Sequence, residues 1–224
     1  MIKRLKYSKK PYWIAIEGTD GVGKTSLTRE ITFSLKSQHI GKECILLNEF
    51  SSSPIGQVLS KIIEEKTFFM LGDGEHYPIS ETLALCSDYI FQVEKIMREK
   101  RAKDYLVSDR GILSFLVYQG IRLRDSYGRS FKWNDWMNSI FAPIPKPDLT
   151  ICITSPVDQI RRRLEKRGDI VTTNNLKAIV DFQEEFLKIL RNQDPNSYMI
   201  VENLDGKLNE VSKLTVSKIL TLSK

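Results

Sequence analysis

The sequence contains few cysteines and no long apolar segment, and both shortages exclude classes of protein. Its 224 residues include three cysteines, Cys44, Cys86 and Cys152, which are too few and too far apart for a disulfide framework or a four-ligand zinc site. The longest stretches without Asp, Glu, Lys or Arg have 11 residues, whereas a membrane-spanning helix needs ~18–20 apolar residues. No secretory leader is recognisable. We therefore expect a cytoplasmic protein with buried free thiols and no membrane partner.

Charge of one sign is in excess only at the start of the chain. The formal net charge is +6, but five basic residues between Lys3 and Lys10 account for most of it, and residues 11–224 carry a net charge of +1. Such an arm is either a solvated terminus or a segment that binds nucleic acid. Because the rest of the chain is nearly neutral, we favour the solvated arm and expect no nucleic-acid partner.

Short β-branched runs alternate with longer segments of helical periodicity along the chain. The predicted strands are residues 12–16, 43–47, 105–108, 148–154 and 197–201. The predicted helices begin at Lys24 and Pro54 and otherwise span 78–103, 111–124, 133–141, 157–167, 176–191 and 207–222. Strands that are separated by helices pair in parallel, so we predict a three-layer α/β fold in one domain, residues 1–224, with a basic arm at 1–10. Two segments, 68–77 and 168–175, are predicted to be mobile.

The first predicted strand leads into a complete phosphate-binding motif. Residues 18–25, GTDGVGKT, match G-x-x-x-x-G-K-[ST], and a helical pattern follows them. The glycines permit a tight loop whose N–H groups surround a polyphosphate at the start of a helix. We expect Lys24 to reach the β- and γ-phosphates and Thr25 to bind Mg²⁺ through its hydroxyl. A chance match is the alternative, but chance matches seldom lie between a strand and a helix.

Two charged residues end the third predicted strand. Asp109 lies at the carboxyl end of that strand, where ligands bind in parallel sheets, and is expected to hold Mg²⁺ through water. The alternative role for Asp109 is a helix N-cap. The guanidinium of Arg110 suits a second phosphate group, which it can bind through two hydrogen bonds.

At this point the chain resembles the thymidylate kinases, a family of P-loop nucleoside monophosphate kinases. Residues 16–25 are similar to the family's E-G-x-D-G-x-G-K-T loop, and residues 49–56, EFSSSPIG, are similar to its E-P-G-G-T-P-I-G segment. Three further motifs match: S-D-R at 108–110 with Ser114 and Tyr118-Gln119-Gly120, P-D-L-T at 147–150, and R-x-x-x-R-G at 163–168.

The resemblance implies a P-loop NTPase fold with a five-stranded parallel sheet in the order 2-3-1-4-5. It also implies transfer of the γ-phosphoryl group from ATP, with Mg²⁺, to a nucleoside monophosphate, and homodimers that form through helices. The implied ATP-binding residues are Gly18, Gly21, Val22, Gly23, Lys24, Thr25 and Ser26. The implied acceptor-binding residues are Asp20, Glu49, Leu85, Tyr89, Arg110, Ser114, Phe115, Tyr118 and Gln119.

Three of these positions carry a more detailed role by resemblance. Asp20 is expected to hold the sugar 3′-hydroxyl or the water shell of the metal, and Arg110 the acceptor phosphate. Tyr118 is expected to exclude a 2′-hydroxyl and so to favour deoxyribose. Such a reaction requires positioning and cancellation of charge on the transferred group, with no covalent intermediate.

The charge-cancelling arginine of this family lies either in the phosphate loop or in a lid. Residues 19–22 contain no arginine, so the resemblance points to a short mobile lid at about 161–175. Arg163 and Arg167 lie four residues apart on one helix face, and we expect at least one of them to be catalytic. The alternative is a solvated helix face that packs through Ile160 and Leu164.

The base pocket departs from the family pattern. The family places a Phe and an Arg where this chain has Leu85 and Tyr89, and a small polar residue where it has Phe115. We therefore keep three functions open: a kinase for dTMP, a relative that phosphorylates another pyrimidine or non-standard monophosphate, and a nucleotide-binding protein without kinase activity. We expect the first and predict that the enzyme discriminates less sharply among pyrimidines.

Overall fold

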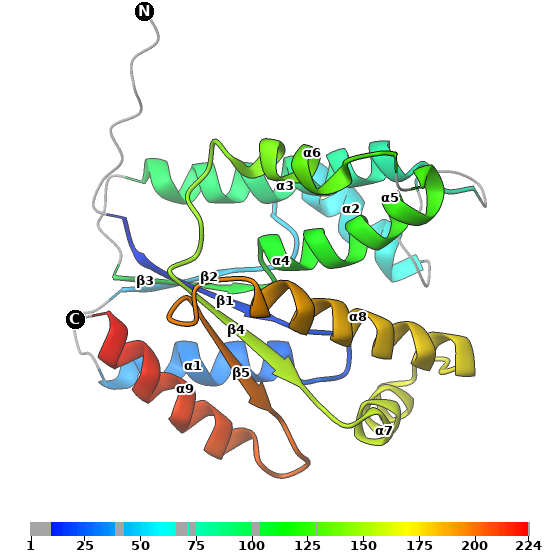
Figure 1. The fold of residues 1–224 in the computed structure, drawn as a ribbon. Coiled ribbons are helices and arrows are strands. Elements are labelled where there is room, and N and C mark those ends of the chain that lie inside the picture. The colour runs from blue at the N-terminus through cyan, green and yellow to red at the C-terminus, as the bar shows by residue number, and fades with distance from the viewer. Residues whose placement is uncertain are drawn as a thin grey trace, which may run out of the picture. The chain divides into compact units, whose positions relative to one another are not determined.

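The computed structural model of the protein describes residues 10–38, 43–65, 71, 75–99, 104–128 and 130–223 (Figure 1). Its strands are β1 (Tyr12–Glu17), β2 (Cys44–Leu47), β3 (Tyr105–Asp109), β4 (Leu149–Thr154) and β5 (Tyr198–Glu202). All five predicted strands are confirmed within one residue at each end. They form a sheet in the order β2-β3-β1-β4-β5. This order confirms the fold class that the sequence indicated.

Strand β1 lies at the centre of the sheet and sets its register. It pairs in parallel with β3, where Ile16 lies opposite Asp109, and with β4, where Ile16 lies opposite Ile151. Strand β4 pairs in parallel with β5. The carboxyl ends of β1 and β3 therefore meet at one edge, and this edge carries both the phosphate-binding motif and Asp109.

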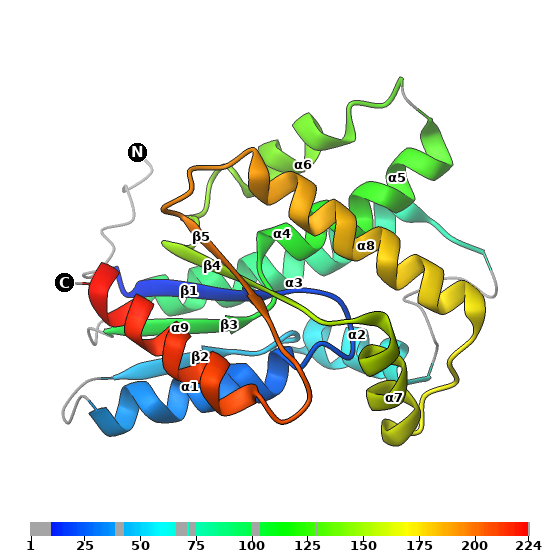
Figure 2. The ribbon, with the colours of Figure 1, turned by 60° about the horizontal axis from the view of Figure 1, so that its bottom comes forward.

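Different helices cover the two faces of the sheet (Figures 1 and 2). Helices α1 (Lys24–Gln38) and α9 (Leu208–Leu222) lie side by side on one face, and α8 (Thr173–Arg191) lies on the other. Alternate residues of β1 face each side, as a strand requires: Ile14 and Ile16 join the buried cluster that includes Ile31 of α1 and Ile219 of α9. Phe186 of α8 is fully buried outside this cluster.

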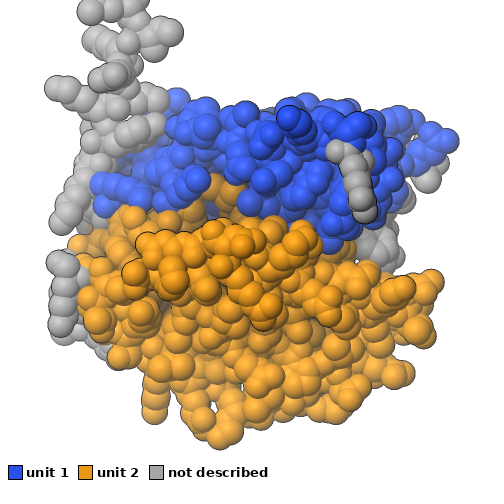
Figure 3. Space-filling view, viewed as in Figure 1, with its two compact units in different colours: residues 1–10, 47–102, 115–146 blue, residues 11–46, 103–114, 147–224 orange. Residues whose placement is uncertain are grey.

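The chain divides into two compact units (Figure 3). The sheet unit comprises residues 11–46, 103–114 and 147–224 and also contains α4 (Ile112–Ser114) and α7 (Val157–Arg167). The helical unit comprises residues 1–10, 47–102 and 115–146. Its elements are α2 (Pro54–Glu65), α3 (Pro78–Arg98), the π-helix η1 (Phe115–Gln119), α5 (Gly120–Tyr127) and α6 (Trp133–Phe141). No helix in the described ranges has the length and apolarity that a membrane span requires.

The start of α2 follows directly from its sequence. The backbone N–H of Gly56 donates to Oγ of Ser53, at 3.1 Å, so Ser53 is the N-cap and Pro54 occupies the first helical position. Gly56 cannot carry a side chain, because a Cβ atom would lie 2.3 Å from the carbonyl oxygen of Ser51. The glycine lets the preceding loop pack directly on the first turn.

Two predicted elements differ in detail from the structure. The helix predicted over 111–124 contains the π-helix η1, which locally lengthens the turn; five residues of altered spacing are too few to show in the apolar periodicity. The predicted mobile segment 168–175 overlaps the first turn of α8, because the Thr172 hydroxyl accepts from Asn175 N and starts the helix at Thr173.

Three other predictions fall partly or wholly outside the described residues. They are most of the basic arm, most of the segment 68–77, and the end of the helix that was predicted to reach residue 103.

A buried carboxylate ties the end of β1 to the last residue of α4. The Glu17 carboxylate is fully buried and accepts hydrogen bonds from the N–H of Ser114, at 3.2 Å, and from its hydroxyl. Burial raises the pKa of Glu17 to about 7, although the hydrogen bonds from Ser114 and the charges of Arg110 and Lys24 act in the opposite direction.

Glu17 therefore makes stability depend on pH. Its pKa in the folded protein exceeds the ordinary value of 4.5, so the folded state binds a proton that the unfolded state has released. The contribution of Glu17 is fully present below pH 4.5 and is lost as the pH rises to about 7. We expect Glu17→Gln, which imitates the protonated acid, to gain stability relative to the parent over this window, by up to ~1.4 kcal/mol per pH unit.

Urea unfolding at several pH values between 4.5 and 8 tests this expectation. Glu184→Gln, at an exposed position on α8, serves as the matched control for loss of a carboxylate. A difference between Glu17→Gln and the parent that does not change with pH would contradict the predicted titration.

Candidate nucleotide-binding site

The loop between β1 and α1 has a backbone that only glycine adopts readily. Gly18, Gly21 and Gly23 have φ angles of +136°, +78° and +98°. A Cβ atom on Gly18 would also lie 2.4 Å from the carbonyl oxygen of Ile153. The three glycines of the motif therefore serve the turn itself, as the sequence predicted, and the loop ends at the first turn of α1.

Lys24 begins α1, and its side chain curls back over the loop. Its Nζ donates to the carbonyl oxygen of Thr19 at 2.8 Å and lies 3.4 Å from Oδ1 of Asp20. The side chain is buried, so this cation is held in place by the loop that it is expected to serve. A buried ammonium with oxygen partners is suited to exchange them for phosphate oxygens.

Thr25 and Asp109 meet across the edge of the sheet. Oγ1 of Thr25 donates to Oδ2 of Asp109 at 2.7 Å. A hydroxyl and a carboxylate are hard oxygen ligands of the kind that Mg²⁺ prefers, and Mg²⁺ usually keeps several waters. The donor set of these two residues therefore fits one Mg²⁺ ion. Ser26, the next residue of α1, is exposed.

Asp20 and Arg110 form an ion pair beside the loop. Nη2 of Arg110 lies 2.6 Å from Oδ1 of Asp20. Partial removal from water acts to raise the pKa of Asp20, but the attraction of Arg110, Lys24 and Arg167 outweighs it and holds this pKa below its usual range. Asp20 therefore stays ionised at any physiological pH.

Arg110 has an unusual backbone for a residue with a side chain. Its φ angle is +78°, and every other residue with a positive φ in the described part of the chain is a glycine. Its N–H donates to the carbonyl oxygen of Ile16 at 2.9 Å, which extends the β1–β3 pairing by one residue. Strain of this kind persists where the surrounding structure fixes it, often at functional sites.

Helix α7, which carries the two predicted lid arginines, has both an apolar face and a charged face. Ile160 and Leu164 are buried, as the solvated-face alternative required. The two predicted lid arginines differ: Arg167 is exposed and pairs with Asp169, whereas Arg163 is 23% exposed and hydrogen-bonds with several groups of the sheet unit.

The predicted base-pocket residues of the helical unit form an aromatic cluster. Tyr89 of α3 is buried, and its ring lies 5.1 Å from that of Phe115 and 6.0 Å from that of Phe141, between ring centroids. Leu85, one turn earlier on α3, is half-buried. The structure thus brings together Tyr89 and Phe115 of the predicted set.

The remaining residues that were predicted to bind the acceptor belong partly to one unit and partly to the other. Gln119 is buried, and its Oε1 accepts from Oγ1 of Thr82 at 3.4 Å. Tyr118 is half-buried and Glu49 is exposed. Ser114 belongs to the sheet unit, where both its N–H and its hydroxyl are engaged by Glu17.

Two buried carboxylates of α3 organise the helical unit, and neither was predicted. Asp88 accepts from the backbone N–H of Ser51, at 2.8 Å, and from the hydroxyls of Ser51 and Ser53, which fixes the loop before α2. Glu81 accepts from the backbone N–H of Tyr77 at 3.2 Å and pairs with Arg122 of α5 at 3.3 Å. The available signal was an acidic residue on the otherwise apolar stripe of a helix.

Asn203 and Asp205 lie in the turn between β5 and α9, and neither was predicted as a site residue. Nδ2 of Asn203 donates to the carbonyl oxygen of Val22 at 2.7 Å, and Asp205 pairs with Arg162 and Arg163. The hydrogen bonds from the two arginines lower the pKa of Asp205. Polar residues that directly follow a parallel strand lie at the ligand-binding edge, and this position was the signal that could have identified them.

Comparison with known proteins agrees with this geometry. The sequence profile of the thymidylate kinase family matches residues 16–213. A probable thymidylate kinase of Sulfurisphaera tokodaii is 26% identical over 96% of this chain and 98% of its own length. A probable thymidylate kinase of Pyrococcus horikoshii is 31% identical over 78% of each chain.

A solved structure shares the fold. Thymidylate kinase from Candida albicans superposes with a TM-score of 0.70, covers 96% of this chain and 94% of its own, and is 21% identical. The family profile spans most of the chain, including the phosphate loop and the S-D-R segment. The chain therefore belongs to the thymidylate kinase family.

Proposed function

We propose that the chain transfers the γ-phosphoryl group of ATP to dTMP, giving dTDP and ADP, as a step in the synthesis of dTTP. Membership of the thymidylate kinase family supports the reaction and the acceptor. The observation that carries the proposal is the group of charged residues around the phosphate loop. Two kinds of group meet at one edge of the sheet. The cations are Lys24 and Arg110, the latter paired with Asp20, and the metal ligands are Thr25 and Asp109.

The donor nucleotide is held by the loop and the first turn of α1. The N–H groups of Gly21, Val22 and Gly23 and the start of α1 bind the phosphates, and Lys24 bridges the β- and γ-phosphates. Thr25 would hold Mg²⁺ directly and Asp109 through water. Mg²⁺, when bound, neutralises charge on the phosphate oxygens.

The acceptor is held mainly through charge. Arg110 binds the acceptor phosphate through two hydrogen bonds, and Asp20 keeps the guanidinium oriented until the acceptor arrives. Tyr118 excludes a 2′-hydroxyl, and Glu49 and Gln119 complete the acceptor contacts. These residues position the attacking oxygen and do not form a bond to it.

The cation that stabilises the transition state comes from the lid. Arg167 is the better placed of the two predicted arginines, because it is exposed and its charge already acts on Asp20 of the phosphate loop. Its ion pair with Asp169 is exposed and therefore worth little, so Arg167 can leave it for a phosphate oxygen.

A second acceptor class is favoured by one specific observation. The family's arginine is absent from α3, and the Tyr89 that replaces it packs against Phe115 and Phe141. A pyrimidine carbonyl thus loses one charge-assisted donor. We propose that dUMP or another pyrimidine monophosphate competes with dTMP more effectively than is usual in this family.

The chain also has features that suit a homodimer in the cytoplasm. Four large apolar side chains of the helical unit, Ile55 and Val58 of α2 and Leu83 and Phe91 of α3, are between 45% and 58% exposed. Exposed apolar side chains on neighbouring helices favour association with a second copy of the chain. All three cysteines are buried free thiols, which accords with a reducing compartment.

Release of ADP from ATP, assayed with each natural nucleoside monophosphate in turn, tests the proposed reaction. We expect dTMP to be the preferred acceptor and deoxyribose to be preferred over ribose. Turnover with none of the acceptors would leave only a nucleotide-binding protein, and preference for another acceptor would replace dTMP in the proposal.

We predict that Lys24→Ala abolishes turnover and leaves the fold intact. The substitution removes the cation that bridges the phosphates where negative charge develops, and loss of such a group costs at least ~100-fold in kcat. Steady-state kinetics with circular dichroism as the folding check measures both effects. Lys36→Ala, at the exposed end of the same helix, is the matched control and should behave like the parent. Near-normal kcat in folded Lys24→Ala would refute the assignment.

We predict a modest preference for dTMP, measured as kcat/KM for dTMP, dUMP, dCMP and UMP. Tyr89→Phe removes only the hydroxyl of Tyr89, and we expect it to reduce the discrimination between dTMP and dCMP by roughly 3- to 10-fold, since one neutral hydrogen bond is worth ~1 kcal/mol. Tyr127→Phe, at an exposed position, controls for loss of a phenol. If dTMP ranks last, or if Tyr89→Phe equals the parent, the base is recognised by other groups.

We predict a dimer in solution that Val58→Asp converts to the monomer of 25.9 kDa, because a buried unpaired carboxylate opposes association. Light scattering after gel filtration measures the mass. Gln57→Asp adds the same charge at the preceding position of α2 and should leave the dimer unchanged. A parent protein that is already monomeric would remove the dimer from the proposal.

A further inference from the structure

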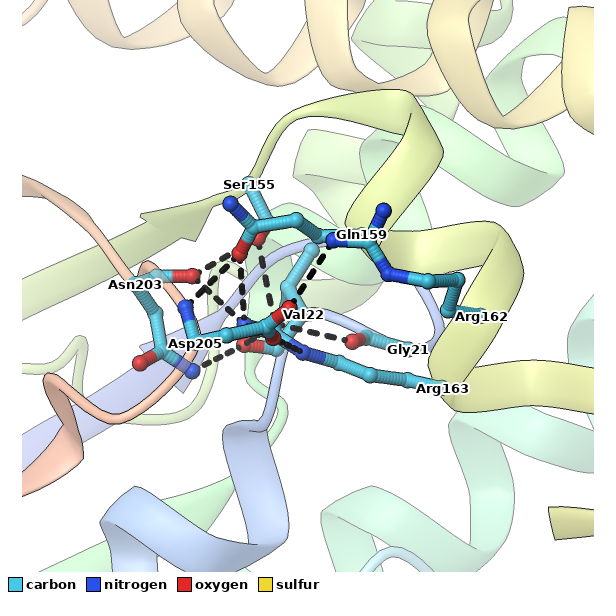
Figure 4. Close-up of polar contacts among 8 residues, drawn as sticks. All are labelled: Gly21, Val22, Ser155, Gln159, Arg162, Arg163, Asn203 and Asp205. Atoms are coloured by element: carbon cyan, nitrogen blue, oxygen red, sulfur yellow. Dashed lines mark hydrogen bonds and ion pairs between the residues drawn. The ribbon is translucent and has the colours of Figure 1, made fainter. Parts of the chain in front are cut away.

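Arg163 is surrounded by acceptors that belong to the protein itself (Figure 4). A guanidinium offers five N–H donors, and the structure provides partners for its three nitrogens. Nε donates to Asp205 at 2.9 Å. Nη1 donates to the hydroxyl of Ser155 at 3.0 Å and to the carbonyl oxygens of Gly21 and Val22 at 3.3 and 3.4 Å. Nη2 donates to the carbonyl oxygen of Asn203 at 2.9 Å and to Gln159 at 3.1 Å.

These partners come from four separate segments of the sheet unit. Gly21 and Val22 belong to the phosphate loop, Ser155 follows β4, and Asn203 and Asp205 lie in the turn after β5. The fourth segment is α7 itself, through Gln159, whose Oε1 also accepts from the N–H of Asp205 at 2.7 Å. Arg163 thus joins α7 to the outer side of the phosphate loop and to the β5–α9 turn.

The contacts with the loop fix the direction of two peptide groups. In a planar trans peptide the carbonyl oxygen of one residue and the N–H of the next point in opposite directions. Arg163 holds the carbonyl oxygens of Gly21 and Val22, and Asn203 Nδ2 also donates to Val22 O at 2.7 Å. The N–H groups of Val22 and Gly23 must therefore point away from Arg163, towards the inner side of the loop.

The loop rests closely on the same groups. A Cβ atom on Gly21 would lie 2.9 Å from Cγ2 of Ile160, and one on Gly23 would lie 2.6 Å from Nδ2 of Asn203. Contact with α7 and with the β5–α9 turn therefore depends on glycine at both positions. Displacement of Arg163 would remove this donor from the carbonyl oxygen of Gly21 and leave that of Val22 with Asn203, so the loop could rotate these peptides more easily.

We infer that Arg163 is a positioning residue that orients the peptide N–H groups of Val22 and Gly23 towards the phosphates of the donor nucleotide. This assignment deepens the proposed function and rests on it. It separates Arg163 from Arg167, which keeps the role at the transition state. The guanidinium of Arg163 donates its hydrogen bonds to groups of the protein. It therefore affects phosphate binding indirectly, by holding the phosphate loop.

The assignment is tested by binding, with no acceptor present. The probes are Mg·ADP and Mg·tripolyphosphate, the second of which has no base or sugar and reports on the loop alone. We expect Arg163→Ala to weaken the binding of both probes by about 10-fold and to raise the KM for ATP, with the KM for dTMP changed less than about 2-fold. Arg167→Ala should lower kcat and leave both affinities within about 2-fold of the parent.

Asp205→Asn extends the test to a residue that holds Arg163. It should weaken tripolyphosphate binding in the same direction, and the double variant Arg163→Ala/Asp205→Asn should bind no more weakly than Arg163→Ala. Arg161→Ala, which breaks an exposed ion pair with Glu165 on the same helix, is the matched control. If Arg163→Ala does not fold, the Asp205→Asn affinity and faster amide hydrogen exchange at Val22 and Gly23 in that variant decide the matter.

Two results would overturn the inference. Unchanged affinity for both probes with a kcat that falls at least about 100-fold would make Arg163 a transition-state residue like Arg167. Unchanged affinity together with unchanged kinetics would leave it a surface residue. A protein that transfers phosphate to no acceptor but still loses tripolyphosphate affinity in Arg163→Ala would remove the proposed function and keep the role in positioning.

Discussion

The direction of the peptide groups in the phosphate loop is the constraint on which the candidate site depends. A loop that points its N–H groups towards an anion must point the connected carbonyl oxygens towards the protein, where each requires a donor. Here the carbonyl oxygen of Thr19 accepts a hydrogen bond from Lys24, and that of Val22 accepts hydrogen bonds from Arg163 and Asn203. Positive φ angles bring the chain into this shape, and the donors keep it there.

The same constraint explains why the outer side of the loop is as polar as the inner side. Gln159, Ser155 and Asp205 satisfy or orient the donors that hold the carbonyls, so the loop is supported by a network with members in α7 and in two strand ends. Charges at the inner side, Lys24 and the Asp20–Arg110 pair, face a different task. In the proposed reaction they exchange protein partners for phosphate, whereas the outer network keeps its partners.

Much of this arrangement could be predicted from sequence, and the reasons for success and failure are physical. Strands and the phosphate loop depend on local patterns, such as the alternating residues of β1 and the glycines of 18–25, and their positions are confirmed. The partners of Arg163 depend on segments about 40 and 140 residues away, so no spacing of residues indicated them. For the same reason, Arg163 and Arg167 were predicted to act alike, although Arg163 is held by several partners and Arg167 pairs with Asp169.

The helical unit shows the same limit. Tyr89 and Phe115 were expected as pocket residues because a family pattern aligned them, and the structure brings their rings together. The carboxylates of Glu81 and Asp88 were missed, because an acidic residue on a helix is normally solvated and only the folded unit buries it beside its donors. Each carboxylate accepts a hydrogen bond from a backbone N–H group of a neighbouring segment. The two buried carboxylates therefore help to fix the structure of the helical unit.

The π-helix η1 makes the helical unit sensitive to the length of the chain. Each residue of an α-helix turns the next by about 100°, and the π-helix already accommodates one extra residue, so insertion of one further residue between Phe115 and Gln119 would rotate all of α5 by roughly that angle. Gly120 would then leave the ring of Trp133, against which only a glycine fits, and Arg122 would turn away from the buried Glu81. Deletion of one residue there would instead convert the π-turn to an α-turn and leave α5 in place, so the segment tolerates a shorter chain better than a longer one.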